Sequence, residues 1–233
     1  MKQPLFYLAL DTPDLEKAKA MARQVNDVRG DFGYKVNLDL LVLDGGRRVV
    51  TEFREEFGRS IFTDTKTWNG GRTMAELAVG LAQAGSSLVN IYAHSGVAFM
   101  RKVMKTVQDR GATIDVYALG VLTHYTEADC QQQYRRSLSD AVRFFAEQAE
   151  EAGVSGYIQP GTHLHVTSDL PIKKLVPAVR PSWFEDKKAN AQELVVTPEE
   201  ARSGGANIMV CGSPVFKSQD PAEALRMLLQ SCG

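Results

Sequence analysis

The chain contains the sequence Ile61-Phe62-Thr63-Asp64-Thr65-Lys66-Thr67-Trp68-Asn69-Gly70-Gly71. An apolar run leads into two opposite charges, and a glycine pair precedes a segment with helical periodicity, which predicts a strand, a functional loop and a helix. Side chains alternate faces along a strand, so Asp64 and Lys66 should point the same way, with alpha carbons roughly 6 to 7 Å apart. A carboxylate beside an ammonium suits an active site. An exposed ion pair at the mouth of a loop would give the same pattern.

The same unit of apolar strand followed by helix recurs along the chain, at a spacing of about 30 residues that is typical of strand-helix repeats. Besides the strand that begins at Ile61, the pattern predicts strands at 5–10, 33–37, 87–93, 114–122, 156–158, 174–179 and 207–211. Helical segments are expected at 15–25, from about 49 to 57, from the glycine pair to about 84, and at 96–110, 127–152 and 221–229, the segment at 127–152 being either continuous or broken.

Eight such units predict a single-domain α/β protein, a (β/α)8 TIM barrel over residues 1–233. A doubly wound open sheet is the alternative. No GxGxxG or GxxxxGK sequence follows any of the predicted strands, which counts against dinucleotide-binding and P-loop folds.

The composition fits a globular chain with a substantial core. Of the 233 residues, 44% are hydrophobic and 24% are charged, which suits one large α/β domain. The 27 basic and 28 acidic residues give a net charge of −1. No overall field therefore attracts nucleic acid or an anionic membrane, and we expect neither as a partner.

Cysteine usage and the N-terminus predict a cytoplasmic protein. Cys130, Cys211 and Cys232 are far apart, odd in number and without CxxC spacing, as expected in a reducing compartment. The N-terminus lacks the apolar region of a signal peptide, and no 18-residue apolar run follows it. His163 and His165 alternate in a loop but have no third ligand at a fixed spacing, so no metal site is expected.

In a barrel of this type the functional side chains lie at the C-terminal ends of the strands. This rule selects Asp11, Lys35, Asp64, Lys66, His94, His124 and Ser213. For His94, packing within the fold is the favoured interpretation over a role as ligand or base.

Several short motifs occur in a characteristic order. They are Leu8-Ala9-Leu10-Asp11, Tyr34-Lys35-Val36, Asp64-Thr65-Lys66-Thr67-Trp68-Asn69, Leu88 to His94, Gly120-Val121-Leu122-Thr123, Val176-Pro177-Ala178-Val179-Arg180-Pro181, Thr197 to Ala201, Gly212-Ser213-Pro214 and Asp220-Pro221. Together they resemble the orotidine 5'-phosphate decarboxylase family, homodimeric barrel enzymes of pyrimidine synthesis. Relatives that act on sugar phosphates carry an acidic residue on the second strand and use a metal, so Lys35 favours the metal-free orotidylate branch, without a cofactor.

The resemblance implies a role for each charged residue at the strand ends. Lys66 would stabilise a carbanion at C6 of the pyrimidine and then supply its proton. Asp64 would lie near the departing carboxylate. Lys35 would bridge Asp64 and a ribose hydroxyl, and Asp11 would accept a hydrogen bond from the ribose. The further substrate-binding residues implied are Thr123, His124, Pro177, Arg180, Gln192, Gly212 and Ser213.

Four positions depart from the family pattern. Asn69 replaces the acid that each subunit supplies to its partner's site, which moves the matched cluster from neutral to about +1 and predicts weakened catalysis. Ser213 replaces the arginine that binds phosphate. Glu193 replaces the basic residue after Gln192, and His124 replaces a serine that contacts the pyrimidine.

The sequence therefore predicts a carboxy-lyase that converts orotidine 5'-phosphate to uridine 5'-phosphate, as a homodimer with its active site at the interface. Two alternatives remain. The chain is a paralogue acting on another nucleotide, a nucleoside or another carboxylated ring, or it is a barrel that binds a ligand without turnover.

Overall fold

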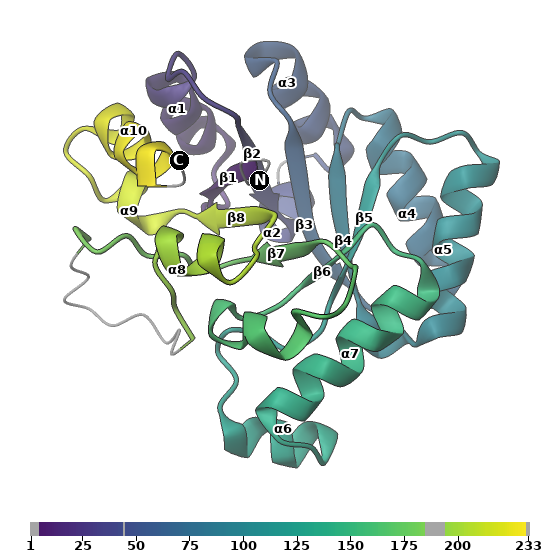
Figure 1. Cartoon of the computed structure of the whole chain (residues 1–233). Helices are drawn as coiled ribbons and strands as arrows, with labels where there is room; N and C mark the ends of the chain where they lie inside the picture. Colours follow the sequence, from purple (N-terminus) through teal and green to yellow (C-terminus); the bar gives the residue numbers. More distant parts are fainter. Residues whose placement is uncertain (1–4, 44, 185–193, 232–233) are drawn as a thin grey trace.

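The computed structural model describes residues 5–43, 45–184 and 194–231. Eight parallel strands close into a barrel, each paired with its neighbour in the chain, and β8 pairs with β1 (Figure 1). The strands are β1 Leu5–Leu10, β2 Phe32–Asn37, β3 Ile61–Thr67, β4 Leu88–Tyr92, β5 Asp115–Leu119, β6 Gly156–Ile158, β7 Lys174–Val176 and β8 Ile208–Cys211. The predicted (β/α)8 barrel is confirmed.

Helices surround this barrel, with α1 packed against α10 and α4 packed against α5 (Figure 1). The α-helices are α1 Leu15–Val25, α2 Leu38–Leu43, α3 Arg47–Phe57, α4 Gly71–Gln83, α5 Val97–Asp109, α6 Glu127–Tyr134, α7 Leu138–Ala152, α8 Pro198–Ser203, α9 Ser213–Phe216 and α10 Pro221–Ser231. Short 3-10 helices, η1 Ala93–Ser95 and η2 Gly161–Thr167, follow β4 and β6.

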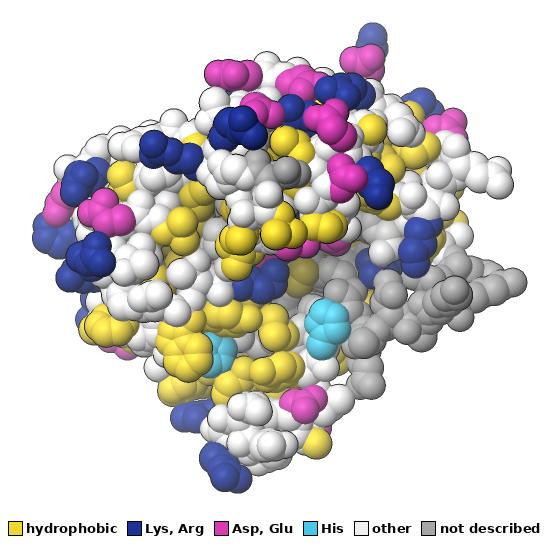
Figure 2. Space-filling view, turned by 180° about the vertical axis from the view of Figure 1, so that it is seen from behind, with side chains coloured by type: hydrophobic (Ala, Val, Ile, Leu, Met, Phe, Trp, Pro, Cys, Tyr) yellow, Lys and Arg dark blue, Asp and Glu magenta, His cyan; other side chains and the backbone are white. Residues whose placement is uncertain are grey.

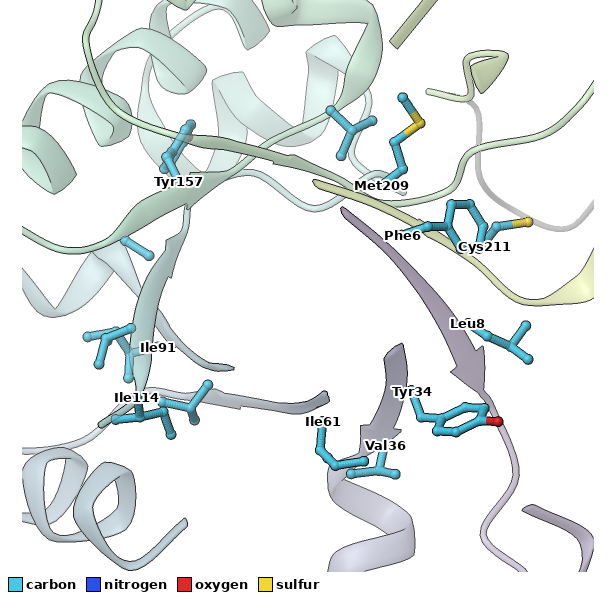
Figure 3. Close-up of a cluster of buried hydrophobic side chains, with 14 of the residues drawn as sticks. Phe6, Leu8, Tyr34, Val36, Ile61, Ile91, Ile114, Tyr157, Met209 and Cys211 are labelled. Carbon is cyan, nitrogen blue, oxygen red and sulfur yellow. The ribbon is translucent and has the colours of Figure 1, made fainter. Parts of the chain in front are cut away.

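Alternation along the strands divides the core into two layers. Phe6, Leu8 and Leu10 belong to the larger cluster, between the barrel and the helices. Figure 3 shows this cluster on the outer side of the ring of strands. Tyr7 and Ala9 belong to a second cluster that fills the barrel. Along each strand, every second side chain thus faces the interior of the barrel. The last of these lies at the C-terminal end of the strand.

The helix expected from about 49 to 57 is α3, while α2 was not predicted. Two predicted strand ends are wrong, each for a local reason. β7 ends at Val176, and Ala178 has a positive φ of 60°, which is incompatible with an extended strand. β5 ends at Leu119. At the next position a Cβ atom on Gly120 would lie 1.9 Å from Tyr157 Oη, so the close approach of these segments requires glycine.

In the described part of the chain, none of the helices is both long enough and apolar enough to cross a membrane.

Candidate active site

A cavity of about 250 Å³ opens at the C-terminal ends of the strands. Its floor is apolar and includes Phe62, Leu119 and Ile158 from the interior of the barrel. One side of its wall is polar, with residues contributed by β1, β2, β3 and β4: Asp11, Lys35, Asn37, Asp64, Lys66 and Asn90. Figure 2 shows a hollow bordered by basic and hydrophobic side chains and a histidine.

Four charged side chains form a chain of ion pairs along this polar wall. Lys35 Nζ lies 2.9 Å from Asp11 Oδ1 and 3.2 Å from Asp64 Oδ2. Lys66 Nζ lies 2.6 Å from the same oxygen of Asp64. The two lysines and two aspartates sum to zero charge. The ion pair predicted between Asp64 and Lys66 is therefore present, and it extends to the neighbouring strands.

The members of this network differ in their exposure to solvent. The side chains of Lys35 and Asp64 are 9% and 8% exposed, whereas that of Lys66 is 41% exposed. Burial by itself would raise the pKa of Asp64, but the charges of Lys35 and Lys66 outweigh it and lower this pKa to about 2. Burial likewise acts to lower the pKa of Lys35, and the carboxylates of Asp64 and Asp11 raise it above its ordinary value. Both groups stay charged at neutral pH, and the Lys66 ammonium faces the cavity.

The backbone of β3 is irregular where it carries the ion pair. Thr63 pairs with Val89, but the next pairing is between Thr67 and Ile91, so Asp64, Thr65 and Lys66 lie opposite Asn90 alone. Such a bulge redirects side chains and increases local twist. Lys66 has a φ of 45°, which is uncommon for a residue other than glycine. Simple alternation therefore does not describe this segment, although the two charges meet as expected.

Asn90 holds the bulge from the neighbouring strand. Its Nδ2 donates to Asp64 Oδ1 at 2.7 Å, and its Oδ1 accepts from the Lys66 backbone N–H at 2.7 Å. Thr65 Oγ1 donates to the Asn90 carbonyl at 2.8 Å. Asn90 is 1% exposed, and its bonds with Asp64 and Thr65 are buried away from water. One buried carboxamide thus fixes both members of the ion pair.

Sequence reasoning missed two residues at this wall, Asn37 and Asn90. Asn37 Nδ2 donates to Asp11 Oδ1 at 2.9 Å, and its Oδ1 accepts from Lys35 Nζ. Each position carried a signal, because Asn37 lies two residues after Lys35 on one strand and Asn90 is a polar residue within an apolar strand.

The opposite side of the cavity contains most of the remaining predicted residues. Its lining includes Thr123, His124, Pro177, Arg180, Gly212 and Ser213. A Cβ atom on Gly212 would lie 3.0 Å from the Ala9 carbonyl oxygen and 3.2 Å from Asp11 Oδ2, so glycine lets β8 end close to β1.

Among the described residues predicted from the family resemblance, Asn69 is not part of this lining. Asn69 is exposed, and its Oδ1 accepts from the Gly70 backbone N–H at 2.7 Å. Gln192, like the neighbouring Glu193, lies outside the described residues.

His94 lies among aromatic rings beside the cavity, away from its lining. Its ring centroid is 4.3 Å from that of Phe145, 5.1 Å from Tyr134 and 6.0 Å from Trp68. Burial lowers its pKa. These contacts favour packing as its role. Among the described residues, His, Cys, Asp and Glu side chains form no group of three or more that could hold a metal ion.

Comparison with known proteins gave one family and many relatives. A model described as "Orotidine 5'-phosphate decarboxylase / HUMPS family" matches residues 4–228. Orotidine 5'-phosphate decarboxylase of Paramagnetospirillum magneticum is 29% identical over 227 residues, which cover 94% of each chain. The protein of the same name from Caulobacter sp. strain K31 is 32% identical over 225 residues, covering 95% of this chain and 93% of that one.

Solved structures with the same fold are also found. A crystal structure of orotidine 5'-phosphate decarboxylase from Lactobacillus acidophilus superposes with a TM-score of 0.83 and 20% identity over the full length of both chains. An uncharacterised conserved protein from Geobacillus kaustophilus gives a TM-score of 0.80 at 22% identity, covering 98% of this chain and 100% of that one. At these identities the two structures support the barrel fold.

Proposed function

The chain belongs to the orotidine 5'-phosphate decarboxylase / HUMPS family, and from this premise we propose that it is a carboxy-lyase converting orotidine 5'-phosphate to uridine 5'-phosphate. The observation that carries the proposal is the position of Lys66. Its ammonium is partly exposed to the cavity and lies 2.6 Å from Asp64, which is itself buried and paired with Lys35.

Lys66 performs the central step in this proposal. The bond between C6 and the carboxylate breaks, carbon dioxide leaves, and the electron pair stays on C6. A fixed ammonium stabilises this developing negative charge and then donates its proton to the carbon. Asp64 and Asn90 hold Lys66 in place, through the carboxylate and the backbone N–H respectively. Preorganised charge of this kind needs little rearrangement during the reaction.

The remaining residues bind the nucleotide. Asp11 and Lys35 face the ribose, and Thr123 and His124 lie at the base. The cations among the described lining residues are Lys35, Lys66 and Arg180, so Arg180 receives the phosphate while Ser213 contributes only a hydroxyl. Gln192 keeps its predicted role on the strength of the resemblance alone.

We further propose that the protein is a cytoplasmic homodimer in which Asn69 reaches the partner's cavity. The support is a set of exposed apolar side chains in the segments that follow β2, β3 and β4, namely Leu38, Val42, Leu43, Trp68 and Phe99, of which Trp68 directly precedes Asn69 in the chain. A second copy would remove this surface from water. Sedimentation analysis tests the dimer, and a monomer at micromolar concentration would exclude it. Cys130 and Cys211 are free thiols, as suits a reducing compartment.

Product analysis with orotidine 5'-phosphate tests the activity. Wild-type protein in buffer containing EDTA should form uridine 5'-phosphate, and Lys66→Ala should abolish its formation. Lys105→Ala is the matched control, because Lys105 is an exposed lysine whose ion pair is with Asp109 on its own helix. Equal activity of the two variants would refute the role of Lys66.

The substitutions at His124 and Ser213 favour one second candidate, a paralogue that acts on another carboxylated ring or on a nucleoside. Thermal shifts with uridine 5'-phosphate, uridine and sugar phosphates separate the possibilities, because a ligand that binds the folded state raises the melting temperature. Stabilisation by nucleosides alone would support the second candidate. Stabilisation only by sugar phosphates with Mg²⁺ would exclude both orotidylate and nucleoside chemistry.

A further inference from the structure

The hydrogen bonds of Lys35 account for every N–H of its ammonium group. Lys35 Nζ donates to Asp11 Oδ1 at 2.9 Å, to Asp64 Oδ2 at 3.2 Å and to Asn37 Oδ1. An ammonium group has three donors and no acceptor. Although Lys35 lines the cavity, a ligand hydroxyl can accept a hydrogen bond from it only by replacing one of these three partners.

Asn37 is the partner that a ligand can replace. The two carboxylates are held by charge, whereas Asn37 is neutral and lies at the last position of β2, on the cavity wall. Its Nδ2 also donates to Asp11 Oδ1 at 2.9 Å, and this contact is exposed to solvent. The carboxamide therefore accepts from the ammonium and donates to the carboxylate. A sugar hydroxyl can accept and donate in the same way.

We propose that Asn37 is a specificity-determining residue whose carboxamide competes with a sugar hydroxyl of the ligand for Asp11 and Lys35. This inference rests on the proposed nucleotide site and adds a property to it. In a cavity without the carboxamide, a ligand hydroxyl would gain new hydrogen bonds to two charged groups. In this protein, the ligand hydroxyl instead replaces the hydrogen bonds that the Asn37 carboxamide already makes to Asp11 and Lys35. Such a replacement contributes little to affinity. The protein should therefore discriminate weakly between a ribose and a sugar that lacks these hydroxyls.

Calorimetric titration with two nucleotides tests the competition. The probes are uridine 5'-phosphate and 2',3'-dideoxyuridine 5'-phosphate, which lacks both ribose hydroxyls and serves as the matched control ligand. Wild-type protein should bind the two with dissociation constants within about threefold, since the exchange is nearly neutral. Asn37→Ala should bind uridine 5'-phosphate about tenfold more tightly, as expected for one added hydrogen bond to a charged group, and should leave the dideoxy ligand within about twofold.

Two variants of Asn37 are included so that the test does not depend on the folding of one of them. Asn37→Gly removes the same carboxamide as Asn37→Ala, so either folded variant, identified by its thermal transition, is sufficient for the titration. A preference for the ribose in the variant supports the inference. An equal change for both ligands overturns it, as does a tenfold or larger preference for the ribose in the wild-type protein.

Failure of this inference is distinguishable from failure of the proposed function. Turnover of orotidine 5'-phosphate by the wild type, combined with no ribose preference in the variants, refutes only the role of Asn37. Binding of uridine 5'-phosphate by the variants but not by an inactive wild type supports the role of Asn37 and refutes the proposed activity. Absence of nucleotide binding in all three proteins overturns both.

Discussion

Replacing Asp64 by asparagine should destabilise the protein in a pH-dependent way. Asp64 accepts hydrogen bonds from Lys35, Lys66 and Asn90, and its side chain is 8% exposed. Removing one partner of a buried ion pair costs about 3 to 5 kcal/mol, because the other charges stay buried without it. We expect Asp64→Asn to lose about this amount of unfolding free energy at pH 7.

The pKa of Asp64 fixes how this loss changes with pH. The carboxyl has an ordinary pKa of 3.8 and a folded-state pKa of about 2, so the folded state binds its proton less readily than the unfolded state. This difference contributes about 2.4 kcal/mol of stability at pH 7, fully present above pH 4 to 5 and lost as the pH falls toward 2. By pH 3 about 1 kcal/mol of it should be gone. The gap between wild type and Asp64→Asn should shrink accordingly.

Urea unfolding at several values between pH 7 and pH 3 measures this gap. Asp109→Asn is the control for removal of one carboxylate, since Asp109 forms an exposed ion pair with Lys105 that is expected to contribute less than about 1 kcal/mol. A gap that stays constant from pH 7 to pH 3 would refute the lowered pKa. A gap that widens as the pH falls would show that burial raises the pKa of Asp64 by more than the charges of Lys35 and Lys66 lower it.

Two further variants test the bulge and the close approach at β5. Asn90→Ala leaves the Lys66 N–H and Asp64 Oδ1 without their partner, so kcat should fall about a hundredfold with a smaller change in KM, as expected for a misplaced catalytic group. Thr65→Val, which removes a bond to the Asn90 backbone, is the control, and equal losses would contradict the role of the side chain. Gly120→Ala should cost about 2 to 3 kcal/mol in urea unfolding, because its Cβ would overlap Tyr157 Oη. Gly80→Ala, in open space on α4, should instead stabilise by up to about 1 kcal/mol.

The barrel was predictable because its strands are apolar on both faces and recur with the helices at a regular spacing. Phe6 and Leu8 pack against helices while Tyr7 and Ala9 fill the barrel, so β1 appears in the sequence as one continuous apolar run. The ends of strands were harder to predict. Ala178 has a positive φ although alanine, unlike glycine, does not favour this conformation, so its residue type does not predict it.

The charged part of the site was predictable for a similar reason. Asp11, Lys35, Asp64 and Lys66 all end apolar runs, and in a barrel such ends meet at one face. Of the two asparagines that were missed, Asn90 has contacts that depend on pairing across strands. Asn90 reaches Asp64 only because β3 bulges opposite it, and a single sequence does not reveal register.

Asn69 links the charge of this network to the kinetics of the proposed reaction. Asp11, Lys35, Asp64 and Lys66 sum to zero charge. In the proposed dimer Asn69 of the partner subunit leaves this sum unchanged, whereas the family's acid would bring it to −1. Without that added negative charge, the two lysines attract the carboxylate of the substrate more strongly before the reaction begins. Attraction present in the ground state lowers KM but does not raise kcat, because only stabilisation specific to the transition state accelerates the chemical step. Asn69→Asp should therefore raise kcat and KM together. A rise in kcat with KM unchanged would show that the acid acts on Lys66 alone, and no change in either constant would show that Asn69 does not reach the cavity.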